Sequence, residues 1–337
     1  DVDGNLQGNG TTAGVNGSGL IKPGTNGALS SAGLFQSNYL SSAWDTAATG
    51  TASNPIQFDY AYWAPSNTGV PSGFNLDNDA GGSTTGPGDA QGFGFFPGQF
   101  GMLVLSKHPI VESGERTFHN FLWRDMPGAS LPDDPGTPAA QDWYSADELD
   151  VLRLSSKSHW DIPIDVDGSI IHLLASHPTP PVFDGAEDRN GLRNHDEIRF
   201  LADYIDPNQN YMTDDNGNSG GLADGAFFTI VGDLNADTDE GDSTGDPIGT
   251  FLLNNPLINN SVAPTGDGGP DATDTAEFVG GLRVDYALPS SNLNILEAGI
   301  FWPDAADPLA GVDPSDHRLV YVDVAPVPLP AGLPLLI

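Results

Sequence analysis

Hydrophobic residues recur along this chain with two periods, and each period predicts a different element. The stretch "FDYAYWAP" (58–65) alternates apolar and polar positions, and "GMLVLS" (101–106) is a continuous apolar run. Both patterns are typical of β-strands, half-buried in the first case and fully buried in the second. Further strands are predicted at 156–166, 169–178, 226–237, 282–290 and 317–324. The first two of these are joined by "DGS", which predicts a hairpin.

The segment "RNHDEIRFLADYI" (193–205) has the helical period instead. Its apolar face is made by Ile198, Leu201, Ala202 and Ile205. This spacing predicts an amphipathic helix that packs on a sheet. Strands outnumber helices and no linker separates them, so the pattern favours one α/β domain with helices covering the sheets.

Irregular segments are also predicted, because the chain contains 42 glycines and 28 prolines among 337 residues. Residues 1–33 are loop-like, and 127–148 form an excursion rich in proline and aspartate. A short helix is expected at 31–40. The chain begins with Asp-Val-Asp-Gly, without a start methionine or a signal peptide, and we interpret it as processed or incomplete.

The charge of the chain is strongly negative, with 46 acidic and 11 basic residues and a net charge of −35. Such a surface repels the phosphates of nucleic acids, so nucleic acid is possible as a partner but is not favoured. Two interpretations remain open: adaptation to salty water, or carboxylates that hold Ca²⁺ or Mg²⁺. The stretches "DVDGN" (1–5) and "NLDNDAGG" (75–82) resemble calcium loops but lack the later glutamate, so we interpret them as turns. The chain has no cysteine, which argues against thiol chemistry and zinc–thiolate sites.

Polar residues collect at the predicted strand ends: His177 in "LLASHP", Asp233 and Asn235 in "VGDLN", Asp285 in "RVDY", and Asp316 and His317 in "PSDHRLV". Asp233 and Asn235 are two positions apart, so their side chains point to the same side of an extended chain. Each motif alone has a structural explanation: "GDLN" as an Asx turn, "SDH" as a turn, and His177 as a structural residue. Their joint occurrence, in this order, indicates a site.

The motifs "GDLNAD", "LRVDYAL" and "SDHRLVYVDV", preceded by "LLASHP" and "GMLVLSKHPI", resemble the endonuclease/exonuclease/phosphatase superfamily. This superfamily includes deoxyribonucleases, abasic-site endonucleases, sphingomyelinases and inositol-phosphate 5-phosphatases. The resemblance covers roughly residues 90–324. It implies a four-layer α/β sandwich, with two mixed β-sheets face to face and helices outside, in a single domain over 1–324.

The resemblance also implies a phosphoesterase site that uses Mg²⁺, or Mn²⁺ or Ca²⁺ in its place. Asp233 would deprotonate the attacking water, and Asn235 would hold the water or the phosphate. His317 would contact a phosphate oxygen, with Asp316 beside it as a metal ligand or an orienting group. Asp233 is the other expected metal ligand. His177 would make a second phosphate contact, steered by Asp285 as a carboxylate–imidazole pair.

This sequence departs from the superfamily pattern at its beginning. The expected first strand, which ends in asparagine, and the metal-binding glutamate that follows it are not visible, and the first glutamate is Glu112. We therefore expect a fold that lacks its first strand. An N-terminal fragment, or self-association with a neighbouring chain, would fill the gap.

Three further segments have open interpretations. "DRNGLRNHDEIRF" (188–200) concentrates basic residues in an acidic chain. The segment is either a helix paired with carboxylates or a substrate clamp, with Arg189, Arg193 and His195 as candidate ligands. The loops "HPTPPVFDG" (177–185) and "GFGFFPGQ" (92–99) would wall the pocket. We expect their aromatic residues to serve packing rather than substrate stacking.

The C-terminus, residues 325–337, is rich in proline and apolar residues, and no charge follows Asp323. It is either an unstructured tail or an extension packed on the domain. Its "VPLPAGLPLL" resembles the start of a bacterial VPLPA-type sorting signal, a relative of the PEP-CTERM signals. That resemblance implies export to the cell surface or the extracellular space of a bacterium. We expect a secreted metal-dependent phosphoesterase acting on small phosphomonoesters or phosphodiesters. An extracellular nuclease, or a structural surface protein that has lost its metal site, are the alternatives.

Overall fold

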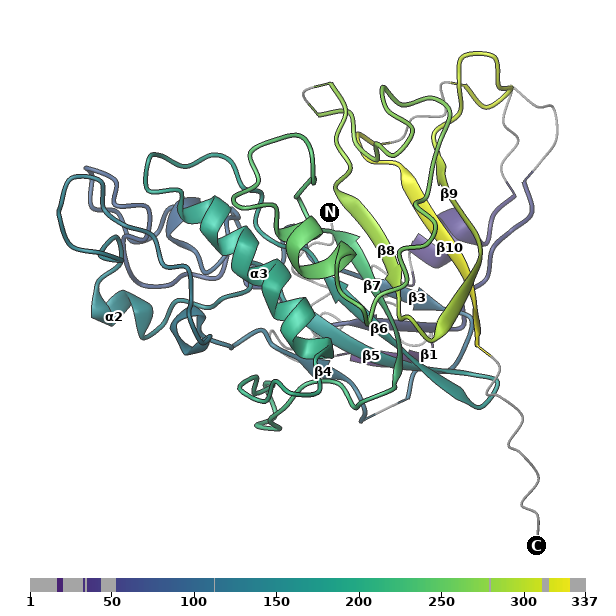
Figure 1. Cartoon of the computed structure of the whole chain (residues 1–337), viewed down its shortest axis with the longest axis horizontal. Helices are drawn as coiled ribbons and strands as arrows, with labels where there is room; N and C mark the ends of the chain where they lie inside the picture. The colour runs from purple at the N-terminus through teal and green to yellow at the C-terminus, as the bar shows by residue number, and fades with distance from the viewer. Residues whose placement is uncertain are drawn as a thin grey trace, which may run out of the picture.

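The strands form three sheets in the part of the chain that the computed structural model describes, residues 17–20, 33, 35–43, 53–111, 113–278, 280–310 and 315–327. The largest sheet has the order β4-β5-β6-β7-β8 (Figure 1). Its strands are β4 (Arg116–Thr117), β5 (His159–Val166), β6 (Ser169–Ser176), β7 (Phe227–Asp233) and β8 (Asp285–Pro289). Only the β6–β7 pair is parallel, so this sheet is mixed.

The β5–β6 hairpin is the one the sequence predicts. Asp167 and Gly168, the two residues between the strands, both have positive φ, 53° and 90°, as a tight two-residue hairpin turn requires. A parallel neighbour needs a longer crossover. The connection from β6 to β7 contains the helix α3 (Arg189–Ile205).

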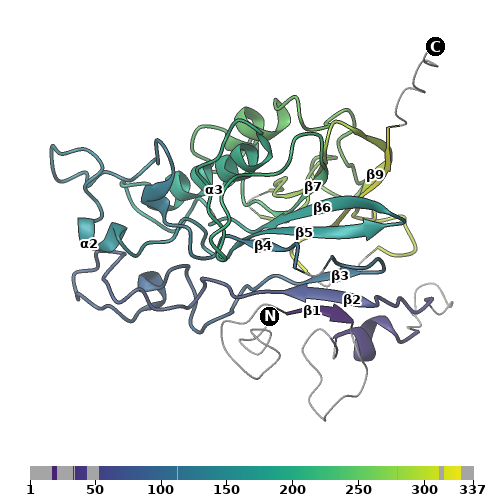
Figure 2. The same cartoon turned by 90° about the horizontal axis from the view of Figure 1, so that it is seen from below.

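A second sheet lies face to face with the first (Figure 2). It is antiparallel and has the order β1-β2-β3, formed by β1 (Gly17–Leu20), β2 (Tyr60–Trp63) and β3 (Val104–Ser106). The ring of Tyr62 meets the edge of Trp160 from β5 at 5.1 Å between centroids. These two side chains, together with Val104 and Ile162, belong to one buried cluster that joins the sheets.

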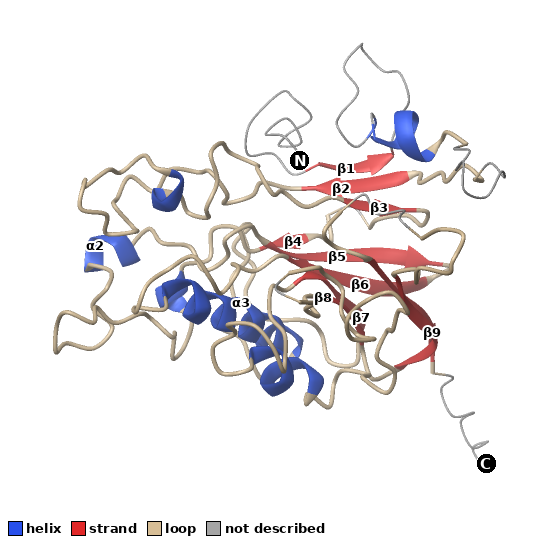
Figure 3. Cartoon of the chain, turned by 90° about the horizontal axis from the view of Figure 1, so that it is seen from above, coloured by secondary structure: helices blue, strands red, loops and turns tan. Residues whose placement is uncertain are grey.

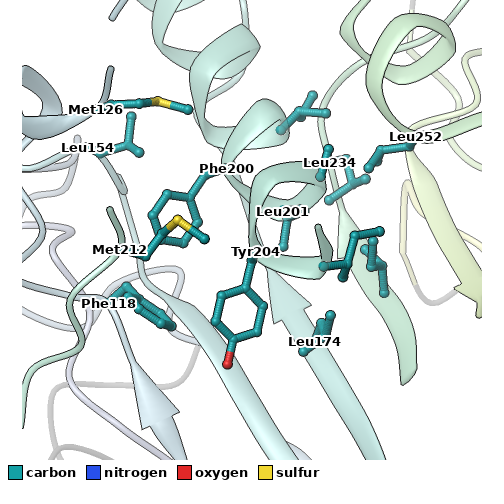
Figure 4. Packing of buried hydrophobic residues seen from close by; sticks show 14 of the residues in the cluster. Phe118, Met126, Leu154, Leu174, Phe200, Leu201, Tyr204, Met212, Leu234 and Leu252 are labelled. Atoms are coloured by element: carbon teal, nitrogen blue, oxygen red, sulfur yellow. The ribbon is translucent and has the colours of Figure 1, made fainter. Parts of the chain in front are cut away.

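Helix α3 covers the other face of the five-stranded sheet (Figure 3). Phe200, Leu201 and Tyr204 of this helix pack against Leu174 of β6 and Phe118 (Figure 4). This is the larger core cluster. The two sheets and the helix confirm the predicted α/β sandwich.

Short helical turns are the remaining regular elements among the described residues. They are the 3₁₀ turns Pro87–Asp89 and Trp123–Asp125, the helix α2 (Ala146–Leu149), and the π-helical turns Gln36–Leu40 and Ile248–Leu253. No helix among the described residues is long and apolar enough to cross a membrane.

Several local predictions need correction. The loop predicted at 1–33 contains the strand β1. The short helix predicted at 31–40 is present, and its residues Gln36–Leu40 are π-helical. A strand that we did not predict, β9 (Leu293–Phe301), pairs antiparallel with β10 (Leu319–Pro326) in a two-stranded sheet. The stretch 75–82 is a turn as expected, since Asn75 Oδ1 and Asp77 Oδ1 both accept from the backbone N–H of Asp79 at 3.2 Å. The other calcium-like stretch, 1–5, lies outside the described residues.

Polar residues at the ends of three strands, β6, β7 and β8, meet at the same end of the large sheet. β6 ends at Ser176 and its parallel neighbour β7 ends at Asp233, so the residues that follow them emerge side by side. β8 runs antiparallel to β7 and begins at Asp285, which is the register partner of Asp233. Residue His317 reaches the same region through a β-bridge to Ala276.

Candidate active site

The carboxylate of Asp233 is the centre of the site. Its Oδ2 lies 3.5 Å from Nε2 of His177 and 3.8 Å from Nε2 of His317. Its Oδ1 accepts the backbone N–H of Asn235 at 2.9 Å. The Asx turn is therefore present, and it fixes one oxygen of Asp233 while the other faces two imidazoles.

Gly232 lets β6 and β7 approach closely just before Asp233. Its φ is 146°, and a Cβ placed there would lie 1.9 Å from the carbonyl oxygen of Ser176. Any other residue at this position would push the two strands apart. This contact sets the separation between Asp233 and His177, which follows Ser176 directly.

Asp285 pairs with His317 rather than with His177, and this corrects the predicted carboxylate–imidazole pair. Oδ2 of Asp285 accepts a hydrogen bond from Nδ1 of His317 at 2.8 Å. The hydroxyl of Thr275 accepts the backbone N–H of Asp285 at 2.9 Å, which fixes the start of β8. The ring of Phe278 packs edge-on against His317 at 5.1 Å. The imidazole is thus oriented with Nε2 toward Asp233.

Lys157 is a buried residue beside the site that the sequence analysis did not single out. Its Nζ donates to the carbonyl oxygen of Pro178 at 3.0 Å, and the side-chain amide of Asn235 donates to the same oxygen at 3.1 Å. The carbonyl next to His177 therefore ties together the segments before β5, after β6 and after β7. The signal in the sequence is a lysine within the polar run "SSKSH", directly before a buried strand.

The side-chain amide of Asn235 stabilises the backbone around the site. Its Nδ2 is engaged with Pro178, and its backbone has a positive φ of 53°, a conformation that asparagine tolerates better than most residues. The predicted contact with water or phosphate is left to the remaining oxygen of the amide.

The two histidines have opposite electrostatic surroundings. The hydrogen bond to Asp285 raises the pKa of His317 to about 9, against the effect of partial burial. Burial lowers the pKa of His177 well below its ordinary value, and the positive charges of Lys157 and His317 lower it further. At neutral pH, His317 is therefore a cation and His177 is neutral.

Asp233 and Lys157 are both shifted toward neutral pH. Burial, and then the charge of Asp285, raise the pKa of Asp233 to about 6, while His317 and Lys157 oppose the rise. Burial lowers the pKa of Lys157 to about 8, although Glu197 and Asp233 favour its charged form. A carboxylate with a pKa near 6 is ionised at pH 7 and is still basic enough to accept a proton.

The residues that could hold a metal ion differ from the predicted pair of Asp233 and Asp316. Among the described residues, the group with converging ligand atoms is Asp233, Asp285 and His317, whose ligand atoms lie within 4.8 Å of one another. Asp316 is exposed, and its carboxylate accepts from Ser315 at 3.3 Å. Asp316 lies in a bend directly before His317, and its carboxylate does not join the group of converging ligand atoms.

The carboxylate oxygens of Asp233 and Asp285 are suitable ligands for a hard divalent cation. Two carboxylates face each other across the β7–β8 pair, and their repulsion contributes to the raised pKa of Asp233. Carboxylate oxygens are the ligands that Mg²⁺, Mn²⁺ and Ca²⁺ prefer. No described glutamate joins the group.

The basic segment of α3 braces the site from inside instead of forming a substrate clamp. Arg193 is 9 % exposed and donates to the backbone carbonyls of Gln91, Arg153 and Leu154. These contacts use its guanidinium inside the protein and correct the prediction that Arg193 binds substrate.

The other two candidates of the clamp are also engaged elsewhere. Arg189 pairs with Glu187 and lies over the ring of Trp143. His195 contacts Asp196 at 3.0 Å. Neither makes a described contact with the strand-end residues, so the prediction that they bind substrate gains no support from the geometry.

Two other polar residues of α3 hold the loops that carry the site. Asn194 donates to the carbonyl oxygens of Thr179 and Leu234, at 2.8 and 2.9 Å. Glu197 accepts from the backbone N–H groups of Ser156 and Thr179, at 2.7 and 2.6 Å. The helix therefore fixes the segments that follow β6 and β7, and the segment that precedes β5.

Comparisons with known proteins identify the family of the chain. The model of the Endonuclease/Exonuclease/phosphatase family matches residues 43–317. The chain therefore belongs to this family, whose members are generally hydrolases that act on phosphoesters. No curated protein matches the chain significantly.

Several solved structures are similar to the chain. An endonuclease/exonuclease/phosphatase from Beutenbergia cavernae DSM 12333 is 16 % identical, with a TM-score of 0.41 over 79 % of this chain and 53 % of that one. A family protein from Leptotrichia buccalis C-1013-b is 15 % identical, with a TM-score of 0.43 over 80 % and 73 %. Sphingomyelinase C from Streptomyces griseocarneus is 14 % identical, with a TM-score of 0.30 over 66 % and 63 %. The chain thus spans about half of the length of the first structure.

Proposed function

We propose that this chain hydrolyses phosphomonoesters or phosphodiesters by activating water at Asp233, with the help of a divalent cation. The observation that carries the proposal is the position of Asp233 between a cationic and a neutral imidazole, His317 and His177. A base, a fixed positive charge and a neutral donor then meet at one point, as hydrolysis of a phosphoester requires.

The residues of the chain divide the chemistry as follows. Asp233 accepts a proton from water, whose oxygen forms a bond to phosphorus. The imidazolium of His317 donates a hydrogen bond to a phosphoryl oxygen, and the neutral His177 donates a second one. The bond from phosphorus to the leaving oxygen breaks, and that oxygen takes up a proton equivalent to the one that Asp233 accepted.

A divalent cation would be held by the carboxylates of Asp233 and Asp285, while His317, which Asp285 keeps protonated, would serve as a hydrogen-bond donor rather than a ligand. When bound, it supplies Lewis-acid polarisation of the phosphoryl group and neutralises developing charge. Dependence on divalent cations is general in the family and supports this assignment.

The acidic surface favours a small phosphoester over long duplex DNA. The net charge of −35 repels a polyanion at long range, while a single phosphate group pays little of that penalty. We also propose that the protein is exported by a bacterium, because of the VPLPA-like stretch. Detection of the full-length protein only in the cytoplasm of its host, with an unprocessed N-terminus, would contradict export.

The test is a panel of soluble phosphomonoesters, soluble phosphodiesters and plasmid DNA, with Mg²⁺ and with EDTA. We expect turnover of small esters that EDTA abolishes. Asp233→Asn should lower kcat by roughly 10²–10⁴-fold, because it removes the base. Asp239→Asn changes an exposed carboxylate in the following loop and serves as the matched control. No turnover of any ester, or full activity in Asp233→Asn, would overturn the proposal.

A further inference from the structure

Asp89 is a buried carboxylate without a counter-charge. The residue is 2 % exposed, and its Oδ1 is buried and accepts no hydrogen bond from any described residue. No ion pair among the described residues includes it. The surrounding sequence offers no cation either, because no Lys, Arg or His occurs from residue 23 to residue 106. The hydration that Oδ1 loses on burial is therefore not replaced, which costs free energy.

The side chain of Asp89 faces the segment that precedes it, and we call residues 75–89 the Asp89 loop. The 3₁₀ turn Pro87–Asp89 ends this loop. Oδ2 of Asp89 folds back over the turn and accepts the backbone N–H of Gly86 at 2.9 Å. A Cβ on Gly88 would clash with Oδ2 of Asp77, from the other end of the loop. Carboxylates from both ends of the loop therefore contact the backbone of residues 86–88.

Oxygen donors alternate along the first part of the Asp89 loop. Asn75, Asp77 and Asp79 occupy every second position, as the first three ligands of a calcium loop do. Asn75 and Asp77 are half-buried. Leu76 between them is 4 % exposed and belongs to the large core cluster. The start of the loop, with its first donors, is thus fixed to the core of the protein.

The sequence pattern of a calcium loop failed here only because its later carboxylate is missing. With Asn75 as the first position, the twelfth position, which carries that carboxylate, is Gly86. The 3₁₀ turn returns the carboxylate of Asp89 to the backbone N–H of this same residue. Asp89 therefore supplies, from further along the chain, the group that the pattern lacks at Gly86.

We propose that the Asp89 loop binds Ca²⁺ through the carboxylates of Asp77 and Asp89. Asn75 and Asp79 add further oxygen donors to the same loop. This is a second cation site, separate from the one that the proposed function requires, and it takes no part in the reaction. Ca²⁺ accepts carboxylate, amide and backbone oxygens together in a flexible geometry. Mg²⁺ demands a stricter octahedral arrangement, so an irregular loop of this composition favours Ca²⁺.

Binding of the ion would tighten the loop. Among the described residues, the group with three ligand atoms within 4.8 Å of one another is that of the active site, so the carboxylates of the Asp89 loop lie further apart. Residues 80–88 contain four glycines, and residues 80–85 are exposed. Such a segment can close around an ion at low steric cost. The ion would then hold this segment against the core beside Gln91, whose side chain accepts the backbone N–H of Arg153 at 3.0 Å.

The test measures Ca²⁺ binding by calorimetry without any substrate, so its outcome is independent of the proposed function. The full chain carries Asp233→Asn/Asp285→Asn, which removes the active-site ligands, and we call this protein the active-site variant. It should still bind Ca²⁺. Adding Asp89→Asn or Asp77→Asn should weaken that binding by at least about 10-fold, because the affinity of a calcium loop depends on the number of its charged ligands. Adding Asp59→Asn changes an exposed carboxylate outside the loop and should leave binding unchanged.

Thermal unfolding of the same proteins separates a metal ligand from a structural carboxylate. In EDTA, adding Asp89→Asn should leave the unfolding temperature of the active-site variant unchanged or raise it. The amide can still accept from Gly86, and it carries no uncompensated charge. In Ca²⁺ the order should reverse, because the ion stabilises only the protein that binds it. A lower unfolding temperature for Asp89→Asn in both solutions would overturn the proposal. So would equal Ca²⁺ affinity with and without Asp89→Asn, or the absence of Ca²⁺ binding by the active-site variant.

Discussion

Asp285 accepts a hydrogen bond from Nδ1 of His317 at 2.8 Å, and the other nitrogen of that ring faces Asp233. One carboxylate therefore keeps the imidazole protonated and directs its charge toward the second carboxylate. The protonated imidazole of His317 is thus held between the carboxylates of Asp285 and Asp233. Removal of either partner should change the protonation of the site more than its fold.

The first prediction concerns this pair. Asp285→Asn removes the charge and the hydrogen bond that raise the pKa of His317 to about 9, so the pKa should fall toward its ordinary value of 6.5. Because the active form needs a protonated His317, activity at pH 8 should drop by about 10-fold or more. NMR titration of the imidazole gives the pKa directly. Asp316→Asn removes an exposed charge that is the smallest of the causes raising the pKa of His317, so it should shift the titration much less than Asp285→Asn.

The second prediction is a bell-shaped pH profile. Activity requires an ionised Asp233 and a protonated His317, so kcat/KM should fall below pH 6 and again above pH 9. Mg²⁺ favours the ionised carboxylate, so the acid limb should move to lower pH as the cation concentration rises. The measurement is kcat/KM from pH 4 to 10 at two Mg²⁺ concentrations. An acid limb that persists unchanged in Asp233→Asn would show that another group causes it.

The third prediction assigns a positioning role to Lys157. Its positive charge lowers the pKa of both His177 and Asp233. Lys157→Met should therefore raise both values, move the acid limb to higher pH, and reduce activity at pH 7 by about twofold if the pKa of Asp233 rises by about one.

The control for that experiment is Lys107→Met, which changes an exposed lysine and should preserve the profile. Thermal unfolding separates the role of the charge from a loss of structure. If Lys157→Met lowers activity equally at every pH, the electrostatic role is wrong and the residue acts only through its bond to Pro178.

The fourth prediction concerns stability. Gly232→Ala would place a Cβ 1.9 Å from the carbonyl oxygen of Ser176, at a φ of 146°. We expect a loss of about 3 kcal/mol in the free energy of unfolding, from the steric clash and the backbone strain together. Gly168→Ala in the β5–β6 turn also has positive φ, but nothing lies within 4 Å of its Cβ. It should lose about 1 kcal/mol. Similar losses for both variants would disprove the close approach of β6 and β7.

The strands and the site residues were largely predictable from the sequence. Apolar runs that stop at polar pairs give both the strand and its end, so Asp233, Asp285 and His317 were found together. The choice of partner was not predictable. Whether Asp285 contacts His317 or His177 depends on how three segments, far apart in the chain, converge in space.

Other misses have different physical causes. β9 mixes buried and exposed positions without a clean alternation, and Leu296 faces solvent. The apolar period of α3 identifies which of its apolar residues are buried, but it does not show whether a basic residue of the helix is buried too. The basic residues were therefore expected at the surface, as a clamp for substrate. In the structure, Arg193 satisfies carbonyl groups that would otherwise lie buried without a donor. These carbonyl groups become buried only when the loops fold over the helix, so the sequence of the helix alone does not reveal that they require a donor.

The loop at residues 92–100 is attached to Asn67, Thr68 and Gly69 by backbone hydrogen bonds, and this attachment has a consequence for how the protein can diversify. The loop hangs from backbone hydrogen bonds, while α3 independently braces the segments around the histidines. Insertions at the loop tip would cost little, since closure entropy grows slowly with length. Selection can therefore vary the exposed residues of this loop while the reacting groups keep their spacing.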